Sequence, residues 1–164
     1  MIRRAAMVWG LLLAALSATP ARADSCDRIA GLRMADLRVT AVKRISPADR
    51  FTPPFEGARP LMLTFCRVEG VIEHEIGFEL WLPEDGRYNG MMLVGGVGGQ
   101  AGTFNYRELA RGVARGYASA STDSGHKAAD RHWLLGRPDR AANYAGRANH
   151  LLATRLRAVL ARLH

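Results

Sequence analysis

A glycine-rich stretch between an apolar run and a helical pattern restricts the fold of this chain more than any other feature. Residues 95–102 read Gly-Gly-Val-Gly-Gly-Gln-Ala-Gly and follow the apolar run Met91–Val94. A short continuous apolar run is typical of a strand that is buried on both faces. Beyond the glycines, apolar residues recur at helical spacing, and Gly116 is placed to end the helix. The helical positions are Tyr106, Leu109, Ala110 and Val113.

The same order of elements then begins again. Tyr117–Ser121 is expected to form a short strand, and a long helix is expected over Asp139–Leu163. Strand, loop and helix in succession predict an α/β sheet with parallel strands. The pattern stops where the next strand should come, so we expect an incomplete sheet and a last helix with part of its apolar stripe uncovered. That stripe consists of Leu152, Leu156, Val159, Leu160 and Leu163.

The chain before residue 90 predicts antiparallel strands. The segments 37–45 and 61–72 are β-prone, and residues 76–82 alternate apolar and other residues with a period of two, which indicates a half-buried strand. Residues 46–60 contain four prolines and predict a loop, and residues 26–32 a short turn or helix. The predicted fold class is therefore α/β, with an incomplete sheet preceded by an antiparallel β segment.

The first 23 residues have the pattern of a secretory signal. A basic start is followed by the apolar run Ala5–Leu16 and by Ala-Arg-Ala ending at Ala23. The apolar run is shorter than the about 20 residues that span a bilayer. We expect cleavage near Ala23, one domain over residues 24–164, and export to the periplasm or the medium without a membrane anchor.

Cysteine and charge content exclude some classes of function. The two cysteines, Cys26 and Cys66, form no C-x-x-C pair, which disfavours a zinc or redox site, and an oxidising compartment favours a disulfide. The net charge is +8, and basic residues outnumber acids from Arg131 onward. Such a tail raises the question of nucleic-acid binding. The secretory signal argues against it, and we interpret the tail as a solvated helix face.

Three roles compete for the glycine loop. Glycine-rich loops between a strand and a helix bind anions or phosphates, or form the oxyanion hole of an α/β-hydrolase. A tight turn that needs glycine only for steric reasons is the third. The dinucleotide fingerprint fails because residue 101 is alanine, and a P-loop fails because no Lys-Ser or Lys-Thr follows.

An acid, a hydroxyl and an imidazole follow the second predicted strand, in Asp123, Ser124 and His126. Residues so close in sequence rarely form the hydrogen-bonded row of a triad. We expect Asp123 to accept hydrogen bonds from loop N–H groups or to pair with an arginine, and His126 to be structural beside the site. No Gly-x-Ser-x-Gly motif occurs, and the other histidines lack metal-ligand spacing.

Read together in order, these motifs resemble the tannase/feruloyl esterase family, which includes mono(2-hydroxyethyl) terephthalate hydrolase. The resemblance spans nearly all of the chain after residue 23. The matching residues are Cys26, 65–70, 77–83, Asn89-Gly90, 95–102, 115–118, 120–126, Trp133 and 147–150.

The resemblance implies acyl transfer on esters of aromatic acids. A serine attacks the ester carbonyl, a histidine moves the proton, an aspartate orients the histidine, and backbone N–H groups hold the oxyanion. The family's serine lies in a Cys-Ser-x-Gly-Gly motif, and a lid domain, often with bound calcium, shapes its pocket. An early cysteine pair like Cys26 and Cys66 is also typical of it. All the triad and lid elements would lie beyond residue 164. Of the family's catalytic elements, the resemblance places only the oxyanion loop in this sequence, with the N–H groups of Gly98 and Gly99 as candidate donors.

The sequence therefore predicts an exported serine ester hydrolase, present here without its triad, its lid or any cofactor. The alternative is a non-catalytic exported protein that retains the scaffold. In both cases we expect the chain alone to be inactive and to fold poorly, because strands of the incomplete sheet would lack partners.

Overall fold

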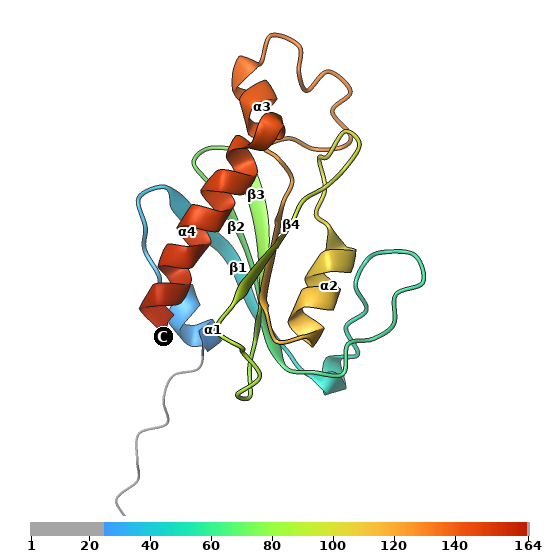
Figure 1. The fold of residues 1–164 in the computed structure, drawn as a ribbon, viewed down its shortest axis with the longest axis vertical. Coiled ribbons are helices and arrows are strands. Elements are labelled where there is room, and N and C mark those ends of the chain that lie inside the picture. Colours follow the sequence, from blue (N-terminus) through green and yellow to red (C-terminus); the bar gives the residue numbers. More distant parts are fainter. Residues whose placement is uncertain (1–24, 164) are drawn as a thin grey trace, which may run out of the picture.

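The computed structural model describes residues 25–163, in which one mixed sheet is flanked by helices (Figure 1). The predicted signal lies outside the described residues. The elements in chain order are α1 (Ser25–Ala30), β1 (Leu37–Ile45), the 3₁₀ turn η1 (Pro47–Asp49), β2 (Phe65–Ile72), β3 (Ile76–Pro83), β4 (Met92–Gly95), α2 (Tyr106–Ala114), β5 (Ala118–Thr122), α3 (Pro138–Ala142), the π-helical turn η2 (Asn143–Arg147) and α4 (Ala148–Leu163).

The five strands lie in the order β1-β2-β3-β5-β4. The pairs β1–β2, β2–β3 and β3–β5 are antiparallel, whereas β4 and β5 are parallel and connected through α2. Phe78 pairs with Thr122 and Trp81 with Ser119, so β3 joins the antiparallel part directly to the parallel part. The predicted α/β fold class is confirmed, and both predicted parts belong to one sheet.

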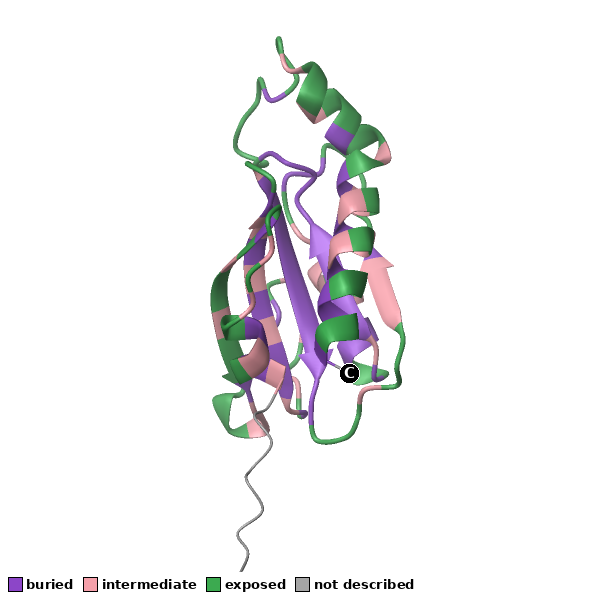
Figure 2. Ribbon diagram, turned by 90° about the vertical axis from the view of Figure 1, so that its left-hand side faces the viewer, coloured by how far each residue is buried: buried purple, intermediate pink, exposed green. Residues whose placement is uncertain are grey.

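Strand β3 is buried on both faces, so the prediction of a half-buried strand is wrong. Phe78 and Leu80 pack in the core beneath α4 and α1, whereas Trp81 packs with Leu109 of α2 on the other face. Figure 2 shows β3 buried along its length while β1 has exposed positions. The alternation in its sequence came from Gly77 and Glu79, which are buried despite their type.

Strand β4 is less buried than its apolar sequence predicts. Met91 is 52% exposed, and Met92, Leu93 and Val94 are of intermediate burial. Within residues 25–163, β4 is an edge strand whose only partner is β5. The prediction of a strand buried on both faces is therefore wrong for the described part of the chain.

The long predicted helix is broken. The structure has α3, the π-helical turn η2 and α4 in its place, and Gly146 in that turn has φ +140°. Only glycine adopts such a backbone conformation readily. The apolar stripe of α4 is fully buried, and the expectation that part of it would be uncovered is wrong. α1 and the sheet cover it as far as Leu163, whose carbonyl accepts a hydrogen bond from Arg28.

A disulfide joins Cys26 of α1 to Cys66 of β2, as predicted, with their Cα atoms 5.4 Å apart. Both cysteines are buried in the core beneath α4. The disulfide attaches α1 to β2, which lies between β1 and β3, and joins residues 40 positions apart in the sequence.

Four arginines of the C-terminal part are paired with acids. Arg137 and Arg140 bind Glu75, Arg147 binds Glu73, and Arg155 binds Asp36. These ion pairs attach the C-terminal helices to the strands, so the tail is not simply a solvated face as we had interpreted it. Among residues 25–163, no helix has the length and hydropathy needed to cross a membrane.

Candidate functional site

The middle of the glycine loop is a tight turn that is open to solvent. The Ala101 N–H donates to the Gly98 carbonyl at 3.2 Å, and Gly99 has φ +64°. Nothing lies within 4 Å of the place that a Cβ would take on Gly98 or Gly99. Their backbone N–H groups donate no hydrogen bond within residues 25–163. The two predicted oxyanion donors are thus accessible to a ligand.

Side chains at the base of the loop bring its two ends together. Ser121, which is buried in β5, donates to the Gly95 carbonyl at 2.9 Å and accepts from the Asn105 N–H at 2.9 Å. Asn105 caps α2 by accepting from the Glu108 N–H, and its amide donates to the Gly96 carbonyl at 2.7 Å. Because its hydroxyl is engaged in this way, Ser121 has a structural role in the loop.

A buried carboxylate fixes the start of α2. Glu79 of β3 accepts hydrogen bonds from Arg67, Trp81 and Tyr106. Burial, followed by the negative charge of Glu79, raises the pKa of the Tyr106 phenol. Since Tyr106 is the first residue of α2, this contact holds the helix start, and with it the end of the glycine loop, against the sheet.

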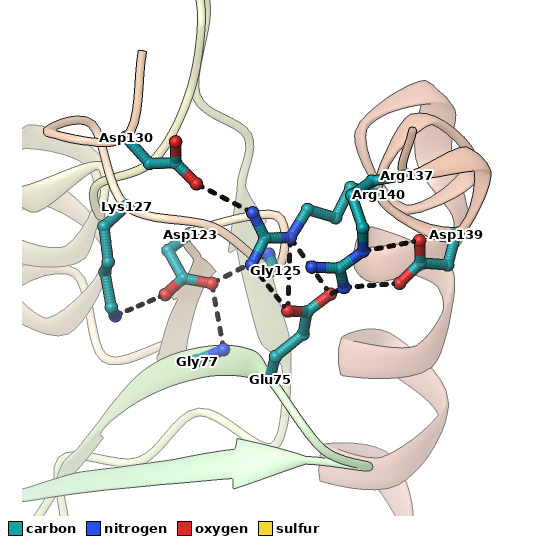
Figure 3. Close-up of polar contacts among 9 residues, drawn as sticks. All are labelled: Glu75, Gly77, Asp123, Gly125, Lys127, Asp130, Arg137, Asp139 and Arg140. Carbon is teal, nitrogen blue, oxygen red and sulfur yellow. Dashed lines mark hydrogen bonds and ion pairs between the residues drawn. The ribbon is translucent and has the colours of Figure 1, made fainter. Parts of the chain in front are cut away.

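Asp123 has the loop role that its sequence position predicts. Its buried carboxylate accepts hydrogen bonds from the N–H groups of Gly77 and Gly125, both at 2.9 Å (Figure 3). The cation beside it is Lys127, 2.6 Å away, and not an arginine. Asp123 and His126 share no hydrogen bond, because the His126 ring bonds Gln100, so the segment forms no triad.

Glu75 attaches the segment after β5 to the β2–β3 turn. It accepts hydrogen bonds from Arg137 and Arg140, and Arg140 also binds Asp130 (Figure 3). The hydrogen bond from Arg140, together with that from Arg137, lowers the pKa of Glu75. The hydrogen bond from Arg137 lowers the pKa of Asp139 to about 2. This network positions residues 127–140 next to the glycine loop.

Three aromatic residues lie beside the loop, and we call them the aromatic cluster: His126 and Tyr144, which bond its backbone, and Trp133, which packs between their rings. The rings of His126 and Trp133 stack with centroids 3.8 Å apart, and those of Trp133 and Tyr144 lie 5.1 Å apart. The Nε2 atom of His126 is 2.7 Å from the Gln100 carbonyl oxygen, and the Tyr144 hydroxyl donates to the Gly99 carbonyl.

The contact between Tyr144 and the loop could not be predicted from the sequence. The residue lies in η2, within what was predicted to be a continuous helix, so its direction had no sequence signal. Trp133 and His126 did have a signal, because both belong to the motifs that resemble the esterase family. The structure stacks these two residues on each other and places the His126 ring against Gln100, whereas Asp123 accepts from the Gly77 N–H.

The loop separates two hollows. One, of about 490 Å³, is lined by Gln100 and by residues 131–135, where Leu134 and Leu135 are 47% and 78% exposed. The other, of about 350 Å³, is lined by residues from 54–55, 97–98 and 103–107. A ligand that reaches the loop N–H groups thus has apolar side chains close by. Within residues 25–163, no three acidic, histidine or cysteine side chains gather where they could hold a metal ion.

Residues 62–163 match the family described as tannase and feruloyl esterase. The chain belongs to this family. A similar protein is an uncharacterized esterase of Xanthomonas campestris pv. campestris, with 34% identity over 142 residues, which are 83% of this chain and 24% of the relative. Another is a probable feruloyl esterase B-2 of Aspergillus flavus, with 33% identity over 101 residues, covering 57% of this chain and 19% of the relative.

Solved structures show the same fold. The crystal structure of feruloyl esterase B from Aspergillus oryzae matches 74% of this chain and 25% of that one, with a TM-score of 0.62 and 21% identity. The structure of an esterase from the same organism matches 77% of this chain and 27% of that one, with a TM-score of 0.60 and 24% identity. The chain thus spans about a quarter of the length of its esterase relatives.

Proposed function

We propose that this chain forms the oxyanion side of an exported carboxylic-ester hydrolase that acts on esters of aromatic acids through a serine acyl-enzyme. The observation that carries the proposal is the glycine turn after β4, whose Gly98 and Gly99 N–H groups have no partner within residues 25–163. Membership of an esterase family makes acyl transfer the chemistry to which such donors are suited.

The chemistry requires donors at the point where negative charge develops. When a serine oxygen attacks an ester carbonyl, the carbonyl oxygen becomes an anion, and preorganised backbone N–H groups stabilise it more than water does. The turn at Gly98–Ala101 is fixed by its own hydrogen bond and by Ser121 and Asn105 at its base. The donors therefore need little reorganisation during the reaction.

The nucleophile and base are assigned outside residues 25–163. Ser121 is engaged in holding the loop, and Ser124 is buried in the turn beside Asp123. Because the relatives are about four times as long as the matched region, we assign the serine, its histidine and the aspartate to a part equivalent to the remainder of those proteins. A lid with calcium, if present, belongs to that part as well, and no step here is routed through it.

A non-catalytic exported protein that retains the scaffold is the alternative. Reading the gene beyond the codon for His164 distinguishes the two. A Cys-Ser-x-Gly-Gly motif in any downstream frame supports the hydrolase, and its absence supports the alternative. Export rests on the pattern of the first 23 residues, and mass spectrometry of the exported protein is expected to find Asp24 at its N-terminus.

The direct test is a chimera in which residues 25–163 replace the matched region of the Xanthomonas esterase. We expect the purified chimera to hydrolyse a hydroxycinnamoyl ester, and residues 24–164 alone to show no turnover, because an acyl transfer needs a nucleophile and a base. A chimera that unfolds cooperatively yet has no turnover would contradict the proposal. Turnover by residues 24–164 that a serine-directed inhibitor abolishes would contradict the assignment of the nucleophile.

A further inference from the structure

We propose that Tyr144 and His126 are positioning residues for a backbone oxyanion site whose donors are the N–H groups of Gly99 and Gln100. This rests on the proposed function and refines it, since it replaces Gly98 with Gln100 as the second donor.

All three carbonyl groups from Gly98 to Gln100 are bound. The Gly98 carbonyl accepts from the Ala101 N–H, the Gly99 carbonyl from the Tyr144 hydroxyl, and the Gln100 carbonyl lies 2.7 Å from Nε2 of His126. In a trans peptide, the C=O of one residue and the N–H of the next point in opposite directions. Holding the carbonyls of Gly98 and Gly99 therefore fixes the directions of the Gly99 and Gln100 N–H groups. The His126 contact holds the Gln100–Ala101 peptide, whose N–H donates to the Gly98 carbonyl, so His126 acts on the Gly99 N–H through that bond.

The N–H groups that are oriented in this way remain available. Neither Gly99 nor Gln100 donates its backbone N–H within residues 25–163, and both residues are exposed. The Gly98 N–H is also without a partner there, but the carbonyl of its peptide, on Val97, accepts no hydrogen bond within the same residues. Its direction is thus less restrained than those of the two following amides.

His126 is held in the form that this contact needs. A carbonyl oxygen only accepts, so Nε2 of His126 carries the proton. The other ring nitrogen, Nδ1, is buried and has no partner within residues 25–163. Stacking on Trp133 at 3.8 Å, with the ring planes 4° apart, fixes the orientation of the imidazole. Within residues 25–163, the buried ring thus has one polar contact, and that contact is with the turn.

Tyr144 reaches the turn from an irregular backbone. It lies in the π-helical turn η2, next to the break at Gly146, and its side chain remains 42% exposed. Because the ring is partly exposed, removing the hydroxyl costs little packing, and a Tyr144→Phe variant tests the hydrogen bond without disturbing the core.

The test is nuclear magnetic resonance on ¹⁵N-labelled residues 24–164, titrated with phenylphosphonate as a tetrahedral oxyanion. In the unmodified chain, we expect phenylphosphonate to shift the amide signals of Gly99 and Gln100. In Tyr144→Phe, the Gln100 amide signal should broaden or split, and affinity for the anion should fall about fivefold, the equivalent of one lost hydrogen bond of about 1 kcal/mol. The matched control is Tyr117→Phe, whose ring packs under Arg115 and whose hydroxyl makes no hydrogen bond within residues 25–163.

Unfolding midpoints of all three proteins separate positioning from simple stabilisation. If Tyr144 positions the loop, the unfolding midpoint of Tyr144→Phe should stay almost unchanged. Its anion binding should nevertheless be weaker at temperatures well below that midpoint. Unchanged loop amides and affinity in Tyr144→Phe, or a phosphonate that shifts no loop amide, would overturn the proposal. Failure of the proposed function would instead appear as a folded, inactive chimera while these amide and affinity results hold.

Discussion

At the scale of single residues, the glycines of the loop have two different roles. Gly98 and Gly99 have open space where a side chain would stand, which leaves room for a ligand to approach the backbone. At Gly102, with φ +78°, a Cβ would lie 2.4 Å from the backbone nitrogen of Ala128. The sequence left open whether these glycines serve a ligand or a tight turn. The structure shows that the steric reason applies at Gly102, where residues 123 and 128 bond to its backbone.

We therefore expect Gly102→Ala to destabilise the chain by about 2–4 kcal/mol, from backbone strain together with a clash against rigid main chain. The matched control is Gly86→Ala, where φ is +72° but nothing lies within 4 Å of the added carbon. That variant should cost only about 1 kcal/mol, the strain alone. Urea unfolding of both variants measures the difference, and equal costs would show that the contact with Ala128 is not rigid.

At the scale of elements, sequence patterns predicted most strands and helices. They failed where tertiary contacts determine the burial of a residue or the end of a helix. The two β-prone segments became β1 and β2, and the helix after the glycines became α2 with Gly116 at its end. The break in the last helix could not be predicted, because Gly146 is tolerated within a regular helix and the kink depends on its neighbours. The burial of Glu79 in β3 depends on Arg67 and Tyr106, which are distant in sequence.

The attachment of α3 to the β2–β3 turn should depend on pH. Arginine contacts lower the pKa of Glu75 below its ordinary value of 4.5, so its carboxylate form is the stabilising one. This contribution is present in full above about pH 4.5 and is lost as the pH falls through the lowered pKa. Glu75→Gln should thus cost about 1 kcal/mol at pH 6, and the difference from the unmodified chain should vanish at low pH.

Thermal unfolding between pH 6 and pH 2.5 measures this difference. The control is Glu56→Gln, because Glu56 is exposed and makes no ion pair within residues 25–163. A gap between Glu75→Gln and the unmodified chain that stays constant down to pH 2.5 would contradict the assigned role of the carboxylate.

At the scale of the whole molecule, the described residues form a better-covered unit than the sequence predicted. We expected poor folding because strands would lack partners and the last helix would be partly bare. The structure places β5 between β3 and β4 and buries the stripe of α4, which removes two grounds for that expectation. The unpaired edge of β4 is the one remaining reason to expect poor folding, because an unpaired strand edge favours aggregation. The order of strands and helices in the sequence predicted the fold class, whereas the aromatic cluster could be recognised only from the three-dimensional arrangement.

The most direct test of the central claim is the turnover number of the chimera with and without the Gly99 N–H. Gly99→Pro removes that donor, and losing one oxyanion donor lowers kcat by about 10²–10³. The control is Gly57→Pro, which makes the same change in an open loop where φ is +75°. We predict that kcat falls by this factor in Gly99→Pro, with KM little changed, and stays near that of the unmodified chimera in Gly57→Pro. A folded Gly99→Pro chimera with unchanged kcat would contradict the account.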